Sequence, residues 1–229
     1  IGAGPGVGLA IAKRFGRDGF NVALLGRDQD KLNDRVLNLA EEGIKAQAFY
    51  ANVLERETLI RALKEVSGVW GKIDVLECSP LPAMQTMRTL ASLDIETVQE
   101  QFDFSVLASI AAVQTVLPGM QVRKEGTLLF TTAISAQHPV NMTANFGIAA
   151  GAQLNYVRLL HNNLKADNIF AGIVSIAGLV IPEGVEADQF KAHFPVGLPI
   201  IAPDLVAEQH WKLYTERTQC EAIVGDAGI

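Results

Sequence analysis

The chain has few cysteines, few aromatic residues, and no segment that we recognise as a membrane span or a signal peptide. Its two cysteines, Cys78 and Cys220, form neither a zinc-ligand spacing nor a disulfide framework. We therefore expect no metal site and a cytoplasmic location. The net charge of −6 at pH 7 argues against a nucleic-acid-binding surface and tells us little else about partners.

The chain is instead rich in apolar residues. They make up 49% of the 229 residues, and the mean hydropathy is +0.22. A chain of this length can form one large domain with a substantial core. Because we find no linker, internal repeat or low-complexity segment, we expect a single domain over residues 1–229.

The most informative feature is the glycine-rich start, IGAGPGVG, which runs straight into an apolar helical pattern. Such a turn lets backbone N–H groups and a helix N-terminus approach a pyrophosphate closely. A side chain at Gly6 or Gly8 would block that approach or disturb the packing of helix against strand. Glycines also occur in ordinary tight turns, but the strand-like run at 20–25, one helix later, favours a dinucleotide site.

Strand and helix patterns alternate along the whole chain. Helices are predicted at 6–18, 28–42, 54–67, 94–120, 143–165 and 203–216, and strands at 20–25, 44–50, 73–77, 126–131, 169–176 and 220–224, with a Pro/Gly-rich excursion at 178–203. This alternation predicts an α/β fold, a doubly wound parallel sheet with helices on both faces. Ile1 stands where the first, central strand would end, so we expect roughly five to eight residues, a typical strand length, before it.

The order of these elements resembles that of the short-chain dehydrogenase/reductase family over nearly the whole chain. The stretches that carry the resemblance are the turn at 2–8, GKIDVL at 71–76, VLPGM at 116–120, GTLLF at 126–130, FGIAA at 146–150, Ala177-Gly178, and PDLVA at 203–207. The resemblance implies a Rossmann fold with strand order 3-2-1-4-5-6-7. It also implies an NAD(P)-dependent oxidoreductase that acts on CH–OH and C=O groups.

The family's chemistry uses a tyrosine as general acid/base, a lysine one helical turn later, a serine on the preceding strand and an asparagine on the long helix before it. The resemblance places these four roles on Phe146, Ala150, Ala133 and Ser105. None of the first three side chains can titrate or form a hydrogen bond, and Ser105 is shorter than asparagine. The sequence therefore predicts a member that is impaired or inactive in ordinary carbonyl and alcohol chemistry.

A shift of register does not restore the site, because no Tyr-x-x-x-Lys occurs in the chain. Thr132 neighbours the serine position, but adjacent strand residues face opposite sides of a sheet. Ser135 and His138 follow the fifth strand and are candidates for a substrate pocket. A histidine in such a loop is more often solvated or structural than catalytic.

The end of the second strand bears on the choice of cofactor. NAD-preferring members usually place an aspartate there, whereas this chain has Arg27, whose guanidinium suits a 2′-phosphate. Asp28 follows and is a candidate cap for the next helix. We therefore favour NADP(H) over NAD(H). The predicted cofactor-binding residues are Gly2, Gly4, Gly6, Val7, Gly8, Arg27, Asn52, Val53, Cys78 and Gly178.

The fourth-strand exit departs from the family's Asn-Asn-Ala-Gly, because this chain has CSPL at 78–81. Cys78 is either a reactive thiol or, more commonly for this residue type, a buried structural one.

Three readings of function remain open. The chain is an NADP(H)-binding protein without the usual chemistry, an active oxidoreductase with a non-standard proton donor, or a structural or regulatory subunit that binds no nucleotide. We expect a homodimer or homotetramer, because the family's two long helices pair across a two-fold axis. Apolar residues at helical spacing on these helices are Val106, Leu107, Ile110, Val113, Leu117, Leu154, Val157, Leu160 and Leu164, some of which must face the sheet.

Overall fold

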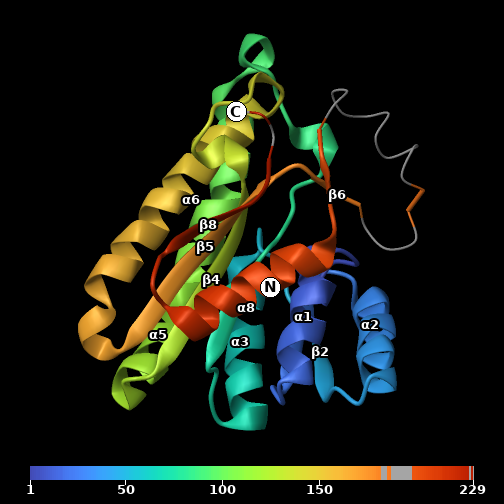
Figure 1. Cartoon of the computed structure of the whole chain (residues 1–229), viewed down its shortest axis with the longest axis vertical. Coiled ribbons are helices and arrows are strands. Elements are labelled where there is room, and N and C mark those ends of the chain that lie inside the picture. The colour runs from blue at the N-terminus through green and yellow to red at the C-terminus, as the bar shows by residue number, and fades with distance from the viewer. Residues whose placement is uncertain (182–184, 187–197, 227, 229) are drawn as a thin grey trace.

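The computed structural model describes residues 1–181, 185–186, 198–226 and 228. Helices and strands alternate along it, as Figure 1 shows. The elements are α1 (Val7–Arg17), β1 (Val22–Gly26), α2 (Gln29–Glu41), β2 (Ala46–Tyr50), α3 (Arg56–Trp70), β3 (Val75–Cys78), α4 (Ile95–Gln101), α5 (Ala108–Arg123), β4 (Gly126–Ala133), α6 (Ala144–Asn163), β5 (Ile169–Ala177), β6 (Leu179–Val180), β7 (Ile200–Ile201), α8 (Pro203–Glu216) and β8 (Glu221–Gly225).

Local sequence signals explain where several helices begin and end. Asp28 caps α2 by accepting a hydrogen bond from the Lys31 backbone N–H at 3.1 Å, and Asp94 caps α4 through Thr97 at 2.7 Å. Helix α3 ends at Gly71, whose φ of 79° places it in the left-handed region. Apart from the helix predicted at 94–120 and the short strands β6 and β7, the predicted boundaries lie within a few residues of those of the structure.

The described strands pair in parallel. β1 pairs with β2, and β3, β4, β5 and β8 form a second sheet in that order. Residues 1–3 lie between the two sheets. The Gly2 N–H donates to the Leu25 carbonyl on β1 at 3.0 Å, and the Ser79 N–H beyond β3 donates to the Ile1 carbonyl at 3.0 Å. The predicted order 3-2-1-4-5-6-7 is thus confirmed, with residues 1–3 in the place of the first strand.

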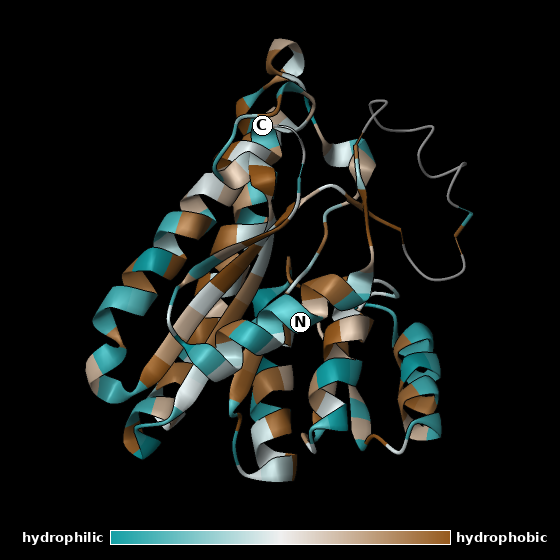
Figure 2. Cartoon of the chain, in the orientation of Figure 1, coloured by the Kyte–Doolittle hydropathy of each residue, from teal (hydrophilic) through white to brown (hydrophobic). Residues whose placement is uncertain are grey.

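Helices cover both faces of the sheet. Leu128 and Phe130 of β4 pack against α3, α5 and α6, while Leu129 between them packs against α1 and α8. This alternation follows from the two-residue period of a strand. Figure 1 shows α1 and α8 together in front of the sheet, and in Figure 2 brown apolar residues run along the strands.

The helix predicted at 94–120 is built from three segments: α4, a π-helical turn at Phe102–Leu107, and α5. The continuous stretch Ile95–Arg123 has a window of mean hydropathy 1.4 and is long enough to cross a membrane. Our expectation that no segment is long and apolar enough was therefore wrong. The physical reason is that a helix facing the core needs the same composition, as Ala112 and Val113, at 0% and 1% exposure, illustrate.

The apolar residues of α6 that suggested an oligomer contact are part of the core. Leu154, Val157, Leu160 and Leu164 are all buried against the sheet. On the outer side, α6 instead exposes Ile148 and Leu159. The homo-oligomer remains a prediction, and these core residues do not support it.

Part of the predicted excursion at 178–203 forms a small parallel pair, β6 with β7. We did not predict these strands, because two residues are too few for a periodic pattern. Residues 182–184 and 187–197 of the excursion lie outside the described residues.

Candidate functional site

The glycine-rich turn is closely packed on two sides. A β-carbon on Gly8 would lie 2.6 Å from the Gly2 carbonyl oxygen, and one on Gly2 would lie 2.6 Å from Pro80 Cα. Gly2 also has a φ of 81°. By contrast, a β-carbon on Gly4 would lie no closer than 3.8 Å to its nearest neighbour. The absence of a side chain at Gly8 therefore lets α1 pack against the residues before it. The same absence at Gly2 lets the turn pack against the residues that follow β3.

The start of α1 is suited to an anion. Gly6 caps the helix without a side chain, and the first turn has no acidic residue. The backbone N–H groups of Val7 and Gly8 have no carbonyl partner among the described residues. Free N–H groups and the positive end of the helix dipole at one point attract negatively charged groups such as a pyrophosphate.

The two residues that follow β1, Arg27 and Asp28, have different roles. Asp28 caps α2 and also pairs with the Lys31 ammonium at 3.0 Å. The hydrogen bonds from Lys31 lower the pKa of the Asp28 carboxyl. Arg27 is exposed and forms no ion pair with the described residues. The capping interpretation of Asp28 is thus confirmed, and Arg27 stands free at the carboxyl end of the strand.

Asn52 has a structural role that we did not predict. Its side-chain oxygen accepts from the Leu54 N–H at 3.2 Å, and its amide nitrogen donates to Glu55 at 2.8 Å. Its backbone N–H donates to Thr58 at 2.9 Å. Asn52 therefore holds the loop between β2 and α3 and keeps one amide N–H for a ligand. Val53 beside it packs against the core.

Cys78 and Gly178 also lie at the carboxyl edge of the sheet. Cys78 ends β3 at 2% exposure, and burial raises the pKa of its thiol to about 12. The thiol therefore stays protonated, which favours the structural interpretation over the reactive one. A β-carbon on Gly178 would lie 2.5 Å from the Pro199 carbonyl oxygen, so this glycine permits a contact within the chain.

The four positions implied by the resemblance gather around α6. Phe146 and Ala150 are on its first two turns, at 8% and 0% exposure, and Ala133 ends β4 just before a turn that packs on α6. Ser105 lies in the π-helical turn, where its hydroxyl donates to the Gln101 carbonyl at 2.7 Å. The chain thus brings these positions together without a titratable side chain among them.

Ser135 and His138 point to different environments. Ser135 is 7% exposed, and its hydroxyl has no hydrogen-bond partner among the described residues. A β-carbon on Gly147 of α6 would lie 3.9 Å from that hydroxyl oxygen. The His138 side chain is exposed. Of the two pocket candidates, only Ser135 therefore has an enclosed polar group beside α6.

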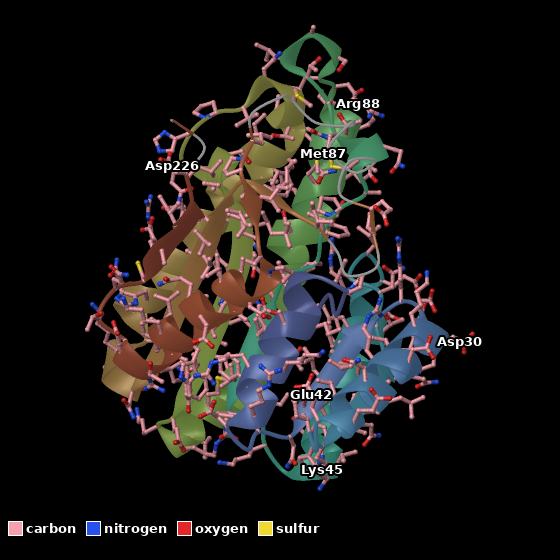
Figure 3. The ribbon with its side chains drawn as sticks, turned by 45° about the vertical axis from the view of Figure 1, so that its right-hand side comes forward. Asp30, Glu42, Lys45, Met87, Arg88 and Asp226 are labelled. Carbon is pink, nitrogen blue, oxygen red and sulfur yellow. The ribbon has the colours of Figure 1, made fainter. Side chains whose placement is uncertain are left out.

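Asn145 is a site residue that sequence reasoning missed. It immediately precedes Phe146 and is fully buried. Its side-chain oxygen accepts from the Arg88 N–H at 2.9 Å, and its amide donates to the Thr86 carbonyl at 2.8 Å. Figure 3 shows Met87 and Arg88 of this held segment at the upper end of the molecule, far from Lys45. The available signal was a polar residue at a core position of an apolar helix.

Comparisons with known proteins agree with this geometry. The chain is 25% identical over 162 residues to the short-chain dehydrogenase/reductase SDRA of Arabidopsis thaliana, covering 71% of this chain and 63% of that protein. Across the first curated relatives it spans about three fifths of their length. The L-sorbose reductase structure from Gluconobacter frateurii, complexed with NADPH and L-sorbose, has a TM-score of 0.83 at 20% identity and covers 96% of this chain and 91% of its own.

A second solved structure, a 7α-hydroxysteroid dehydrogenase complexed with NADH and 7-oxo glycochenodeoxycholic acid, has a TM-score of 0.84 at 18% identity. The match covers 99% of this chain and 91% of that one. At such identities the likeness concerns the fold alone. The family model described as short chain dehydrogenase matches residues 1–188. The chain therefore belongs to the short chain dehydrogenase family.

Proposed function

We propose that this protein binds a nicotinamide dinucleotide, prefers NADP(H), and is strongly impaired in ordinary carbonyl and alcohol chemistry. The main support for the proposal is that this edge of the sheet has the features that bind a dinucleotide but lacks the side chains that would carry the chemistry. The glycine turn and the start of α1 keep the packing and the free N–H groups that a pyrophosphate needs. The positions expected to carry the chemistry have apolar side chains instead.

Binding is supported by the turn and by what related structures contain. The Val7 and Gly8 N–H groups are available to an anion, and Asn52 keeps an amide N–H. The related structures named above hold NADPH and NADH respectively. A dinucleotide is therefore the ligand class that the chain's own donors favour.

The preference for NADP(H) rests on Arg27. Its guanidinium has no ion-pair partner among the described residues and follows β1 directly. A planar guanidinium suits the 2′-phosphate of NADP, and Asp28 beside it is already bound to Lys31 as a helix cap.

Impairment follows from the side chains around α6. Losing a positioned general acid removes roughly 10²–10⁴ in rate, and losing a donor to the developing oxyanion removes roughly 10²–10³. These losses do not simply multiply, because such groups act as a unit. Phe146, Ala150 and Ala133 supply none of these functions.

The alternative of an active oxidoreductase with a non-standard donor is favoured by one observation, the buried hydroxyl of Ser135 beside Gly147, which has no hydrogen-bond partner in the described part of the chain. A hydroxyl alone is a weak acid at neutral pH, so we rank this second. Under this alternative, Ser135→Ala abolishes measurable turnover.

The direct test of binding is a calorimetric titration with NADP⁺ and with NAD⁺. We expect both to bind, NADP⁺ more tightly. Absence of heat and of thermal stabilisation with either would favour the subunit that binds no nucleotide, because a ligand that binds only the folded state must stabilise it.

A further inference from the structure

A network of hydrogen-bonded polar side chains lies on the face of the sheet that α1 and α8 cover. Glu77 of β3 and Thr131 of β4 are joined at 3.0 Å between Oε1 and Oγ1. The same Thr131 hydroxyl lies 2.9 Å from Nε2 of His210 on α8. His210 is fully buried on α8, whose buried residues Val206 and Leu213 belong to the apolar cluster between this helix and the sheet. The proposed chemistry around α6 makes no use of these three residues.

The Thr131 hydroxyl has one hydrogen and two partners, so it can donate in only one direction. When Glu77 is protonated, its carboxyl donates to Thr131, and Thr131 donates to a bare Nε2 of His210. When Glu77 has lost its proton, Thr131 donates to the carboxylate, and His210 must carry the hydrogen on Nε2. The other ring nitrogen, Nδ1, has no partner among the described residues, so neither tautomer is fixed from that side.

Charges in this network are costly because His210 is fully buried and Glu77 and Thr131 are partly buried. Burial is the largest influence on Glu77 and raises the pKa of its carboxyl, while the hydrogen bonds from Ser79 and Thr131 act in the opposite direction. Burial lowers the pKa of His210 to about 3, so its ring stays neutral near pH 7. Cys78 next to Glu77 also stays neutral near pH 7.

Three charged side chains of the covering helices α1 and α8 form ion pairs with residues outside this network. On α1, Lys13 pairs with Glu42, and Arg14 pairs with Asp18 and with Glu208 of α8. Among Glu77, Thr131 and His210, Glu77 is therefore the side chain whose pKa burial shifts upward, toward neutral pH.

Glu77 is connected to the glycine turn. Its Oε2 accepts a hydrogen bond from the Ser79 hydroxyl at 3.0 Å. The Ser79 carbonyl carbon and Pro80 lie 2.8 Å and 2.6 Å from the place of a β-carbon on Gly2. Glu77 therefore holds the segment against which the glycine turn packs.

We propose that Glu77 is a positioning residue that couples dinucleotide binding to the uptake of a proton, with Thr131 and His210 as the groups that reorient. The inference rests on the proposed dinucleotide site. A pyrophosphate bound at the turn is an anion, and an anion near a partly buried carboxyl favours the protonated form of that carboxyl. Binding therefore raises the pKa of Glu77, and a proton is taken up.

The sign of the pH dependence follows from linkage. Affinity is highest while Glu77 is protonated in the free protein and falls as the pH rises through the pKa of the free protein. The fall is at most about tenfold per pH unit for one proton, and it stops above the pKa of the bound form.

The test is calorimetric titration of the whole chain with NAD⁺ and with NADP⁺ between about pH 5.5 and about pH 9, in buffers of different ionisation enthalpy. NAD⁺ is included because a 2′-phosphate itself titrates near pH 6. We expect wild-type affinity to fall several-fold across this range with measurable proton uptake. Glu77→Gln, whose amide N–H donates to Thr131 as a protonated carboxyl does, should bind with a flat NAD⁺ profile. Glu65→Gln, an exposed glutamate on α3, should keep the wild-type profile.

Nitrogen NMR of the His210 ring gives a second readout that needs no variant. The wild-type ring should change tautomer with pH, and in Glu77→Gln it should keep one tautomer. Equal pH profiles in wild type and Glu77→Gln, or a wild-type ring that never changes tautomer, would overturn the coupling while leaving dinucleotide binding intact. Failure of wild type to bind either dinucleotide at any pH would overturn the proposed function as well.

Discussion

The carbonyl oxygen of Gly2 lies 2.6 Å from the position that a β-carbon on Gly8 would occupy. Any side chain at Gly8 must therefore push α1 away from residues 1–3. The helix start is fixed by its packing against the chain before any nucleotide binds. The glycines at this spacing are therefore needed for a contact within the protein as well as for the approach of a ligand.

We expect Gly8→Ala to destabilise the fold by about 1–3 kcal/mol, because the added methyl group meets backbone atoms that cannot rotate away. Dinucleotide affinity should fall with it. The measurements are denaturant unfolding and calorimetric titration.

Gly68→Ala is the matched control for this variant. A β-carbon on Gly68 meets nothing within 4 Å, and the residue lies inside α3. Because alanine is the better helix former, stability should rise by up to about 1 kcal/mol with unchanged binding. If Gly8→Ala proved as stable as the Gly68→Ala protein, the packing argument would fail.

Asn145→Ala should cost about 1–3 kcal/mol of unfolding free energy, because it leaves the partly buried Arg88 N–H and Thr86 carbonyl without their partner. Asn141→Ala is the comparison, since that exposed side chain accepts only from the Leu90 N–H at 3.1 Å. We expect a loss below about 1 kcal/mol there. Equal losses in the two variants would show that burial of Asn145 adds nothing.

Arg27→Ala should weaken NADP⁺ binding by about 1.5–3 kcal/mol, the range for a hydrogen bond to a charged group, and leave NAD⁺ binding nearly unchanged. Lys45→Ala removes an equal charge just before β2, at the opposite edge of the sheet from Arg27 and at the lower end of the molecule in Figure 3, and should change neither affinity by more than a small amount. A parallel loss of both dinucleotides in Arg27→Ala would contradict the proposed contact to the 2′-phosphate.

Restoring the chemistry should require several changes at once. Phe146→Tyr alone should help little, because an unassisted phenol has a pKa near 10 and is poorly matched to neutral pH. Phe146→Tyr with Ala150→Lys and Ala133→Ser should gain more than the sum of the single changes. Since Ala150 is fully buried, the lysine must displace its neighbours at a cost of about 1–3 kcal/mol. NADPH oxidation is therefore assayed at a temperature where each variant is folded, and purely additive gains would contradict the assignment of these positions.

Most of the fold was predictable because its signals are local. Gly71 ends a helix and Asp28 begins one, and each does so through its own backbone or its immediate neighbours. The strands were predicted as buried apolar runs, and their parallel pairing followed from their alternation with helices, whereas the strand order came from the family resemblance. The paired strands β6 and β7 were missed because a two-residue strand carries no period.

The site was less predictable because its contacts join distant segments. Asn52 is the exception, since its contacts are local: it was expected to face a ligand, and Leu54 and Glu55 also bind its side chain, which leaves one amide N–H. Asn145 bonds to a segment more than fifty positions earlier, as its separation of 57 from Arg88 shows. Glu77, Thr131 and His210 are also far apart in the chain, so no local pattern predicts that one hydroxyl joins the other two side chains.

The most direct test of the central claim is NADPH oxidation by the unmodified protein with a panel of ketones and aldehydes, at cofactor concentrations that calorimetry shows to be saturating. We predict rates near background together with clear NADP⁺ binding, because Phe146 cannot exchange a proton at any pH. Robust turnover that persists unchanged in Phe146→Ala would contradict the account, because another group would then carry the proton.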